Sequence, residues 1–226
     1  MFFGSIAKLV RMEPAVKRRA YSSPRRAQAA RQTKAAILAA SRPLFISQGY
    51  AGTTVAAIAE DAGVAVDTVY ASVGRKPQVF RLLLESALSG TDEEVPALER
   101  DYVKQIEATS DAVVKLAVYA EAVTSIQGRL APLFVVVRQA AATEPELAAL
   151  WTSIAERRLT NMRLFAASLQ RTGQLRPELS IEKVADIVWS MNSPDYYLLL
   201  VKERGWKPQD FQTWLLEAWQ RLLLTA

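Results

Sequence analysis

The segment from residue 53 to residue 76 constrains the fold of this chain most, because it has the spacing of two short helices joined by a tight turn. Thr54 is a residue type that caps helix N-termini, and Gly63 permits a sharp turn. The apolar face of the first helix consists of Val55, Ile58, Ala59 and Ala62. With the second helix expected from about Ala65 to Ser72, the pattern predicts a helix-turn-helix.

Positive charge is concentrated at the N-terminal end of the chain. Residues 1–34 contain nine Lys and Arg and a single acid, Glu13, whereas residues 35–226 contain 19 basic and 22 acidic residues. A basic arm over residues 1–30 fits nucleic-acid phosphates or a minor groove, because neutralising phosphates releases counterions. The alternative is a solvated, disordered tail. Met12 is an alternative start to Met1, because the sequence from Glu13 onward reads as an ordinary basic arm.

The residues around the helix-turn-helix resemble the N-terminal pattern of the TetR family of bacterial transcriptional regulators (TetR/AcrR-like). The matching positions are Ile37, Leu38, Ala39, Ala40, Phe45, Gly49, Tyr50, Thr53, Thr54, Val55, Ile58, Ala59, Ala62, Gly63, Val64, Thr68, Tyr70 and Lys76. A less diagnostic similarity in the C-terminal part extends the resemblance to about residues 31–224. The resemblance implies a homodimer that binds a palindromic operator in double-stranded DNA, as a repressor released by a small-molecule inducer.

Three positions depart from the family pattern. Ala65 stands where the family usually has a Ser that caps the second helix, so that cap must come from elsewhere. Val73 replaces the usual aromatic residue, and Pro77 replaces the usual Glu, although Pro suits the first position of a helix. None of these replacements breaks the motif.

The N-terminal residues of the second helix are expected to face base edges in the major groove. Val66 would meet a thymine methyl group, and Thr68 would bond to a base or a phosphate. Asp67 has two open roles: accepting a hydrogen bond from cytosine N4, or compensating the positive end of its own helix. Ala65 completes the predicted reading segment.

Other residues are predicted to position the protein on the phosphate backbone. The resemblance implies phosphate contacts for Tyr70 and Lys76, and for Thr54, whose open alternative is a purely capping role. Arg31 and Lys34 lie near the start of the first predicted helix, where they contact phosphates or remain solvated charges. Such contacts set register without reading sequence.

Beyond Leu84 the apolar periodicity stays helical, with no alternating strand pattern, Gly-rich phosphate loop or internal repeat. The expected fold is all-α, with a three-helix helix-turn-helix DNA-binding domain over residues 31–76. By resemblance, residues 77–226 form a helical ligand-binding and dimerisation domain. Its helices are expected near Lys76 to Leu88, Asp111 to Ile126, Arg129 to Ala142, Pro145 to Arg171, Ile181 to Glu203 and Pro208 to Leu224.

An inducer would bind between the helices of the middle region. The candidate lining residues are Tyr119, Phe134, Arg138, Trp151, Phe165 and Trp189. The alternative for the aromatic members is ordinary core packing, because such rings bury large apolar areas. Arg129 and Arg138 flank an apolar segment, where they either pair with an acidic ligand group or form surface salt bridges.

Composition removes several other classes of function. Cys and His are absent, so thiolate and imidazole metal ligands, redox-sensing thiols and Ser-His or Cys-His catalytic pairs are absent too. We expect no metal site, no cofactor and no enzyme activity. The longest apolar runs, 131–137 and 196–201, are far below the roughly 18 residues of a membrane span, so a cytoplasmic protein without a membrane partner is expected. The main alternative is a helical interaction or scaffold protein without sequence-specific DNA binding.

Overall fold

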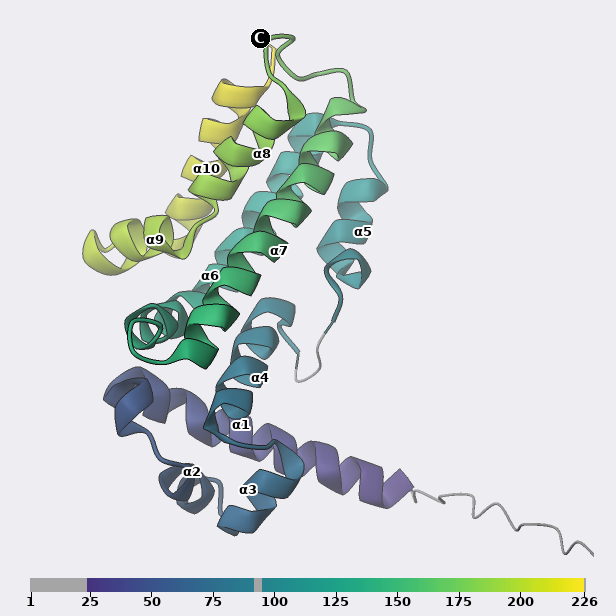
Figure 1. Ribbon diagram of the computed structural model, residues 1–226. Helices are drawn as coiled ribbons and strands as arrows, with labels where there is room; N and C mark the ends of the chain where they lie inside the picture. Colours follow the sequence, from purple (N-terminus) through teal and green to yellow (C-terminus); the bar gives the residue numbers. More distant parts are fainter. Residues whose placement is uncertain (1–23, 92–94, 226) are drawn as a thin grey trace, which may run out of the picture.

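The computed structural model describes residues 24–91 and 95–225, and these residues form the expected all-α fold (Figure 1). Apart from an isolated bridge between Leu175 and Leu224, their regular structure is helical. The helices are α1 (Pro24–Gly52), α2 (Val55–Asp61), α3 (Val66–Ser72), α4 (Lys76–Ser89), η1 (Ala97–Glu99), α5 (Asp101–Glu107), α6 (Ala112–Ala140), α7 (Pro145–Gln170), α8 (Ile181–Met191), α9 (Pro194–Tyr197), η2 (Leu198–Glu203) and α10 (Pro208–Leu223).

The first helix begins earlier than the sequence suggested. We expected an arm over residues 1–30, but α1 already starts at Pro24, because Pro suits a first helical position and the following Ala, Arg and Gln residues favour helix. The rest of the expected arm, residues 1–23, lies outside the described residues. The helical path is interrupted at Gly49 (φ 71°).

The helix-turn-helix forms at one end of the molecule, where α1 crosses α2 and α3 (Figure 1). The Thr54 Oγ1 accepts a hydrogen bond from the Ala57 backbone N–H (3.1 Å), so the predicted cap of α2 is confirmed. Gly63 adopts φ 66° in the turn, a conformation that favours glycine. At the start of α3, Ala65 provides no side-chain cap, as its replacement of Ser implied.

Helix α6 is continuous, although the sequence suggested two helices separated near Gly128. Gly128 lies inside the helix, where a Cβ would be at ordinary contact distance (3.4 Å) from the Tyr197 hydroxyl of α9. By length and mean hydropathy (1.2), α6 is also the one described helix that could cross a membrane. However, 56% of the relevant window is buried inside the protein, as expected for a core helix. Figure 1 shows α6 running between its neighbours through the body.

The helix expected from Ile181 to Glu203 is divided into three elements. Helix α8 ends at Met191, and Ser193 then caps α9 by accepting a hydrogen bond from the Asp195 N–H (3.2 Å). Pro194 follows directly at the first position of α9, where it has no N–H to continue the α8 hydrogen-bond ladder. The π-helical η2 completes the turn toward α10.

Two apolar clusters hold the molecule together. The upper cluster joins α5, α6, α7, α8 and α10, and its largest fully buried residue is Trp219. The lower cluster joins the helix-turn-helix to α4 and then continues onto α6 and α7. Its members include Phe45, Phe80, Leu133 and Leu147, all of which are at most 1% exposed. The helix-turn-helix therefore shares its core with the helices of the body.

Candidate DNA-binding face and ligand cavity

Helix α3 presents an outward face and anchors the opposite face in the core. Val69 is fully buried, whereas Val66 and Tyr70 are 38% and 48% exposed. Asp67 is also exposed, in the first turn of the helix, and Thr68 is half-buried. A short helix that is anchored by one residue and exposed on the other side fits the shape of a recognition helix.

The predicted phosphate-contacting residues lie around this face. Arg31 and Thr54 are exposed, at α1 and at the start of α2, and Lys34 on α1 is half-buried. The Thr54 hydroxyl oxygen is already used as the helix cap, but a hydroxyl also has a proton to donate. The capping and phosphate-binding roles of Thr54 are therefore compatible. Ala65 is also exposed, at the start of α3.

Lys76 connects α4 to the end of α1. Its Nζ donates a hydrogen bond to the Tyr50 carbonyl (3.0 Å) and lies 4.3 Å from the centroid of the Tyr50 ring. Sequence reasoning assigned Lys76 only to DNA and missed this internal contact. An ammonium group has three donors, so one hydrogen bond to Tyr50 leaves donors for a phosphate.

We expect Lys76→Ala to lower the stability of the folded protein and also to make its DNA binding less dependent on salt. The lost hydrogen bond and cation–π contact should reduce the free energy of unfolding by about 1–2 kcal/mol. Loss of one phosphate contact should reduce the salt slope by about one. Urea unfolding and fluorescence anisotropy at several salt concentrations measure the two effects. Lys104→Ala, at an exposed position of α5, is the matched control, and an unchanged slope for Lys76→Ala would exclude the phosphate contact.

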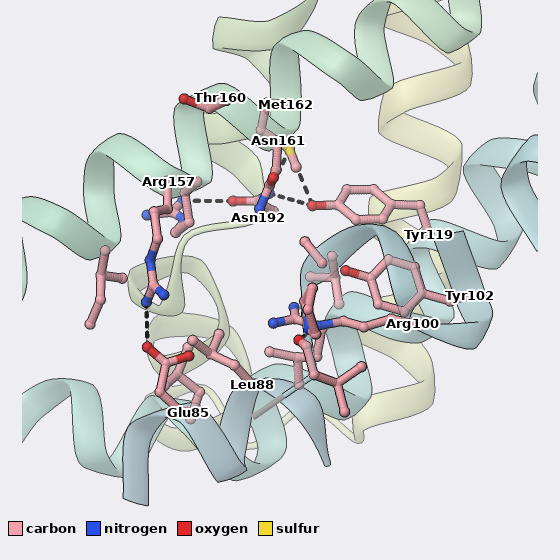
Figure 2. A pocket seen from close by; sticks show the side chains of 18 of the residues that line it. Glu85, Leu88, Arg100, Tyr102, Tyr119, Arg157, Thr160, Asn161, Met162 and Asn192 are labelled. Carbon is pink, nitrogen blue, oxygen red and sulfur yellow. Dashed lines mark hydrogen bonds and ion pairs between the residues drawn. The ribbon is translucent and has the colours of Figure 1, made fainter. Parts of the chain in front are cut away.

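A cavity of about 770 Å³ lies between α4, η1, α6 and α7 (Figure 2). Apolar side chains form much of its wall, and polar side chains enter it from α4, α6 and α7, from Arg100 and from Asn192. The apolar lining residues are Leu88, Val95, Pro96, Ala97, Val123, Ile126, Leu130, Ile154 and Met162. A concave site with an apolar wall and a few placed polar groups is typical of small-molecule binding.

A chain of hydrogen bonds crosses one side of this cavity. The Asn192 Nδ2 donates to the Tyr119 hydroxyl (2.7 Å), and its Oδ1 accepts from the Arg158 Nη2 (2.6 Å). The Gln127 Nε2 donates to the Asn192 carbonyl (2.6 Å). Figure 2 shows Asn192 between α7 and Tyr119. The short α8–α9 connection is thereby fixed to both α6 and α7.

Burial shifts the acidity of two groups in this network. Desolvation raises the pKa of Tyr119 well above its usual value, so its hydroxyl remains protonated at neutral pH. Desolvation also lowers the pKa of the Arg158 guanidinium. Arginine nevertheless remains charged in proteins, so Arg158 is a fixed positive charge beside the cavity.

Helix α4, which follows the helix-turn-helix in the chain, forms part of the cavity wall. Glu85 and Leu88 of α4 line it, and Glu85 is 5% exposed. The Arg157 Nη2 of α7 donates to the Glu85 Oε1 at 2.6 Å (Figure 2). The position of α4 is therefore tied to α7 through a charged contact in the wall of the cavity.

The predicted ligand-binding residues separate into two groups. Tyr119 lines the cavity, and Phe165 and Tyr119 line a smaller adjoining one. The other four do not line the cavity, because each is used in packing or in a surface contact. Phe134 packs on Trp151 (4.4 Å), Arg138 pairs with Asp195 (2.6 Å), and the Trp189 ring lies 4.8 Å from the Arg158 guanidinium carbon.

Sequence reasoning missed the polar residues of the cavity. Glu85, Arg100, Arg157, Arg158 and Asn192 come from four separate parts of the chain. No short motif joins them. The one available signal was Glu85, an acidic residue between Leu84 and Ala87 on the buried side of a predicted helix. A charged residue at a buried position normally has a partner, which the sequence alone did not identify.

Comparison with known proteins agrees with this geometry. Residues 37–81 match the family model described as "Bacterial regulatory proteins, tetR family". None of the curated proteins matches the chain. Similar solved structures include the secondary repressor NalD of the MexAB-OprM multidrug efflux pump in Pseudomonas aeruginosa, with 21% identity, a TM-score of 0.66 and coverage of 87% of this chain and 98% of that one.

Two further structures share the fold. The SmeT–triclosan complex has 18% identity and a TM-score of 0.66, and the match covers 85% of this chain and 92% of that one. A regulator from Saccharomonospora viridis in complex with choline has 15% identity and a TM-score of 0.64, with coverage of 88% and 100%. At these identities the structural matches establish the fold alone.

The exposed α3 and the helical body define a helix-turn-helix transcriptional regulator. Residues 37–81 form the N-terminal domain that the TetR family model describes, and the described residues as a whole have the TetR-like fold. Regulators of this family are typically ligand-responsive repressors, are not enzymes, bind DNA operators and form dimers in the cytoplasm.

Proposed function

We propose that this chain is a cytoplasmic homodimeric repressor that binds a palindromic operator and is released by a small molecule bound in the cavity between α4, α6 and α7. The observation that carries the proposal is the contact of one helix, α4, with both functional parts. It begins at Lys76, beside α3, and lines the cavity with Glu85 and Leu88. In this assignment residues 31–76 bind DNA and residues 77–226 bind ligand and form the dimer.

The proposed DNA contacts use the outward face of the N-terminal end. Val66, Asp67 and Thr68 read bases from α3, whereas Tyr70 and Lys76 hold the phosphate backbone. Ala65, Arg31, Lys34 and Thr54 complete the surface. The exposure of Val66, Asp67 and Tyr70 supports this assignment. Two such faces must lie about 34–36 Å apart to enter successive major grooves, which requires a two-fold dimer.

Ligand binding is coupled to DNA binding through the position of α4. A molecule in the cavity contacts Glu85 and Leu88, and a change in the Glu85–Arg157 pair changes how α4 rests on α7. Movement of α4 changes the separation of the two DNA-binding faces. Shifting the ratio of the released to the DNA-binding conformation from about 1:99 to 99:1 requires the ligand to favour the released one by roughly 5.5 kcal/mol. Two ligands per dimer share this free energy.

Selection of genomic fragments by the purified full-length protein tests this function. We expect enrichment of a palindromic sequence, salt-sensitive binding and release in the presence of a cell extract. The mass of the protein in solution should be twice that of the chain. A strictly monomeric protein, or one that retains no fragment at low ionic strength, would instead favour the helical interaction protein.

A further inference from the structure

The charges of the described residues that line the cavity are not balanced. Arg100, Arg157 and Arg158 line it, together with Glu85 and Glu156. The Glu85 carboxylate is used by Arg157, and Glu156 is exposed to solvent. Within residues 24–91 and 95–225, neither Arg100 nor Arg158 forms an ion pair. Among the residues that the structure describes, the cavity therefore has two guanidinium groups without a carboxylate within ion-pair distance.

Arg158 is held in place by neutral groups. Its Nη2 donates to the Trp189 carbonyl (2.7 Å) and to the Asn192 Oδ1 (2.6 Å), and its guanidinium carbon lies 4.8 Å from the Trp189 ring centroid. These contacts fix the orientation of the side chain but include no carboxylate, and Asp195, whose charge acts on Arg158, is ion-paired with Arg138. Because a desolvated charge without a counter-charge is costly, an anion at this position would be bound strongly.

Arg100 adds a second positive group from another wall. Its Nε donates to the Val95 carbonyl (3.3 Å), a long and neutral contact. Figure 2 shows its guanidinium extending into the cavity beside Tyr102. The side chain is half-buried, so its charge is only partly screened by solvent. Arg100, between η1 and α5, and Arg158, on α7, thus contribute positive charge to the cavity from separate parts of the fold.

The remaining lining specifies the rest of the ligand. Leu88, Val123 and Ile154 offer apolar surface for an aliphatic or aromatic body. Gln127 is 4% exposed and lines the same cavity. Its Nε2 donates to Asn192, whereas its Oε1 has no donor in the described structure. A buried acceptor without a partner is unfavourable, but this atom has almost no exposed area, so it adds no requirement for the ligand.

We propose that the cavity binds an amphipathic organic acid, whose anionic group is held by Arg158 and Arg100 and whose apolar body lies on the walls formed by α4, α6 and α7. This inference rests on the proposed function, because it names the chemical class of the releasing molecule. It distinguishes an anion from a cationic or neutral ligand of the same size.

Matched probes that differ only in charge test this proposal. Isothermal titration calorimetry of the full chain would compare 1-naphthaleneacetate, 1-naphthaleneacetamide and 2-(1-naphthyl)ethylammonium, and then decanoate and decanamide below their aggregation concentrations. On at least one scaffold the carboxylate should bind about tenfold or more tightly than its amide, as expected for a hydrogen bond to a charged group. Tighter binding of the ammonium or amide, or no binding by any probe, would overturn the proposal.

Variants then assign the preference to Arg158 and Arg100. Arg158→Gln and Arg100→Gln should each reduce the ratio of the amide Kd to the carboxylate Kd to about three or less. Arg158→Lys should retain a preference for the anion. Arg163→Gln, at an exposed position of the same helix, is the control for general charge effects and should leave the ratio unchanged. A ratio unchanged in both Gln variants would place the anion elsewhere and overturn the assignment.

Operator binding, measured on the same samples, separates the two proposals. If the protein binds its operator and a neutral or cationic probe releases it, the proposed function stands and the organic-acid inference fails. If the carboxylates bind with the expected preference but no duplex is bound at low salt, the inference stands as a statement about the cavity and the regulatory function fails.

Discussion

Replacing Phe80 with alanine should lower the free energy of unfolding by about 3–5 kcal/mol, the usual cost of deleting a buried aromatic ring. Phe80 is fully buried on α4 and packs edge-to-face on Phe45 (4.8 Å) and Tyr50 (5.6 Å) of α1. These contacts hold α1 against α4. We therefore also expect the affinity for an operator duplex to fall by about tenfold or more. A tenfold weaker Kd corresponds to a loss of about 1.4 kcal/mol of binding free energy.

Urea unfolding followed by circular dichroism, together with fluorescence anisotropy on the duplex, measures both effects. Phe80→Leu is the matched control, because it keeps the site apolar and most of its volume, and it should cost less than half as much as Phe80→Ala. A Phe80→Ala protein with wild-type stability would show that the three rings do not form the core of this end of the molecule.

Replacing Tyr70 with glutamate should abolish DNA binding while leaving the protein folded. Tyr70 is 48% exposed on α3, so the substitution leaves the core intact and should change stability by less than about 0.5 kcal/mol. A carboxylate facing the phosphates introduces a like-charge contact, which costs several kcal/mol. We expect the affinity for the operator to fall by at least about 100-fold.

The matched control is Val113→Glu, which adds the same charge at the start of α6. Val113 is 42% exposed, and the start of α6 lies at the opposite end of the molecule from α3 (Figure 1). Anisotropy titrations at constant salt should show nearly unchanged affinity for this variant. Equal losses in both variants would mean that net charge, and not the α3 surface, governs binding. Tyr70→Phe, which removes only the hydroxyl, should weaken binding more modestly and on all sequences alike.

The helix-turn-helix could be predicted from the sequence because its determinants are local. Thr54 caps α2 and Gly63 forms the turn with contacts made only a few residues away. The boundaries of α6 were harder to predict, because Gly128 lies inside a helix that packs on α9, about 70 positions later in the chain. A glycine that ends a helix and a glycine inside a buried helix look the same in a single sequence.

The ligand cavity was only partly predictable because aromatic residues have two uses. Phe134 and Trp151 were reasonable candidates, but they pack on each other in the lower cluster. The groups that give the cavity its chemical character are instead Arg100 and Arg158. Their position depends on how α5, α7 and α8 pack together, and charged residues with helical spacing most often indicate a solvated surface.

The continuous lower cluster has a consequence for engineered chimeras. Leu133 and Leu147, on α6 and α7, are packed in the same cluster as Phe45 and Phe80. A fragment cut after α4 would leave the apolar side of that helix in water and should aggregate or unfold. To transplant the operator specificity of this regulator onto another sensor, one should exchange the outward residues of α3 within an intact chain. Fusion of an excised N-terminal piece should fail.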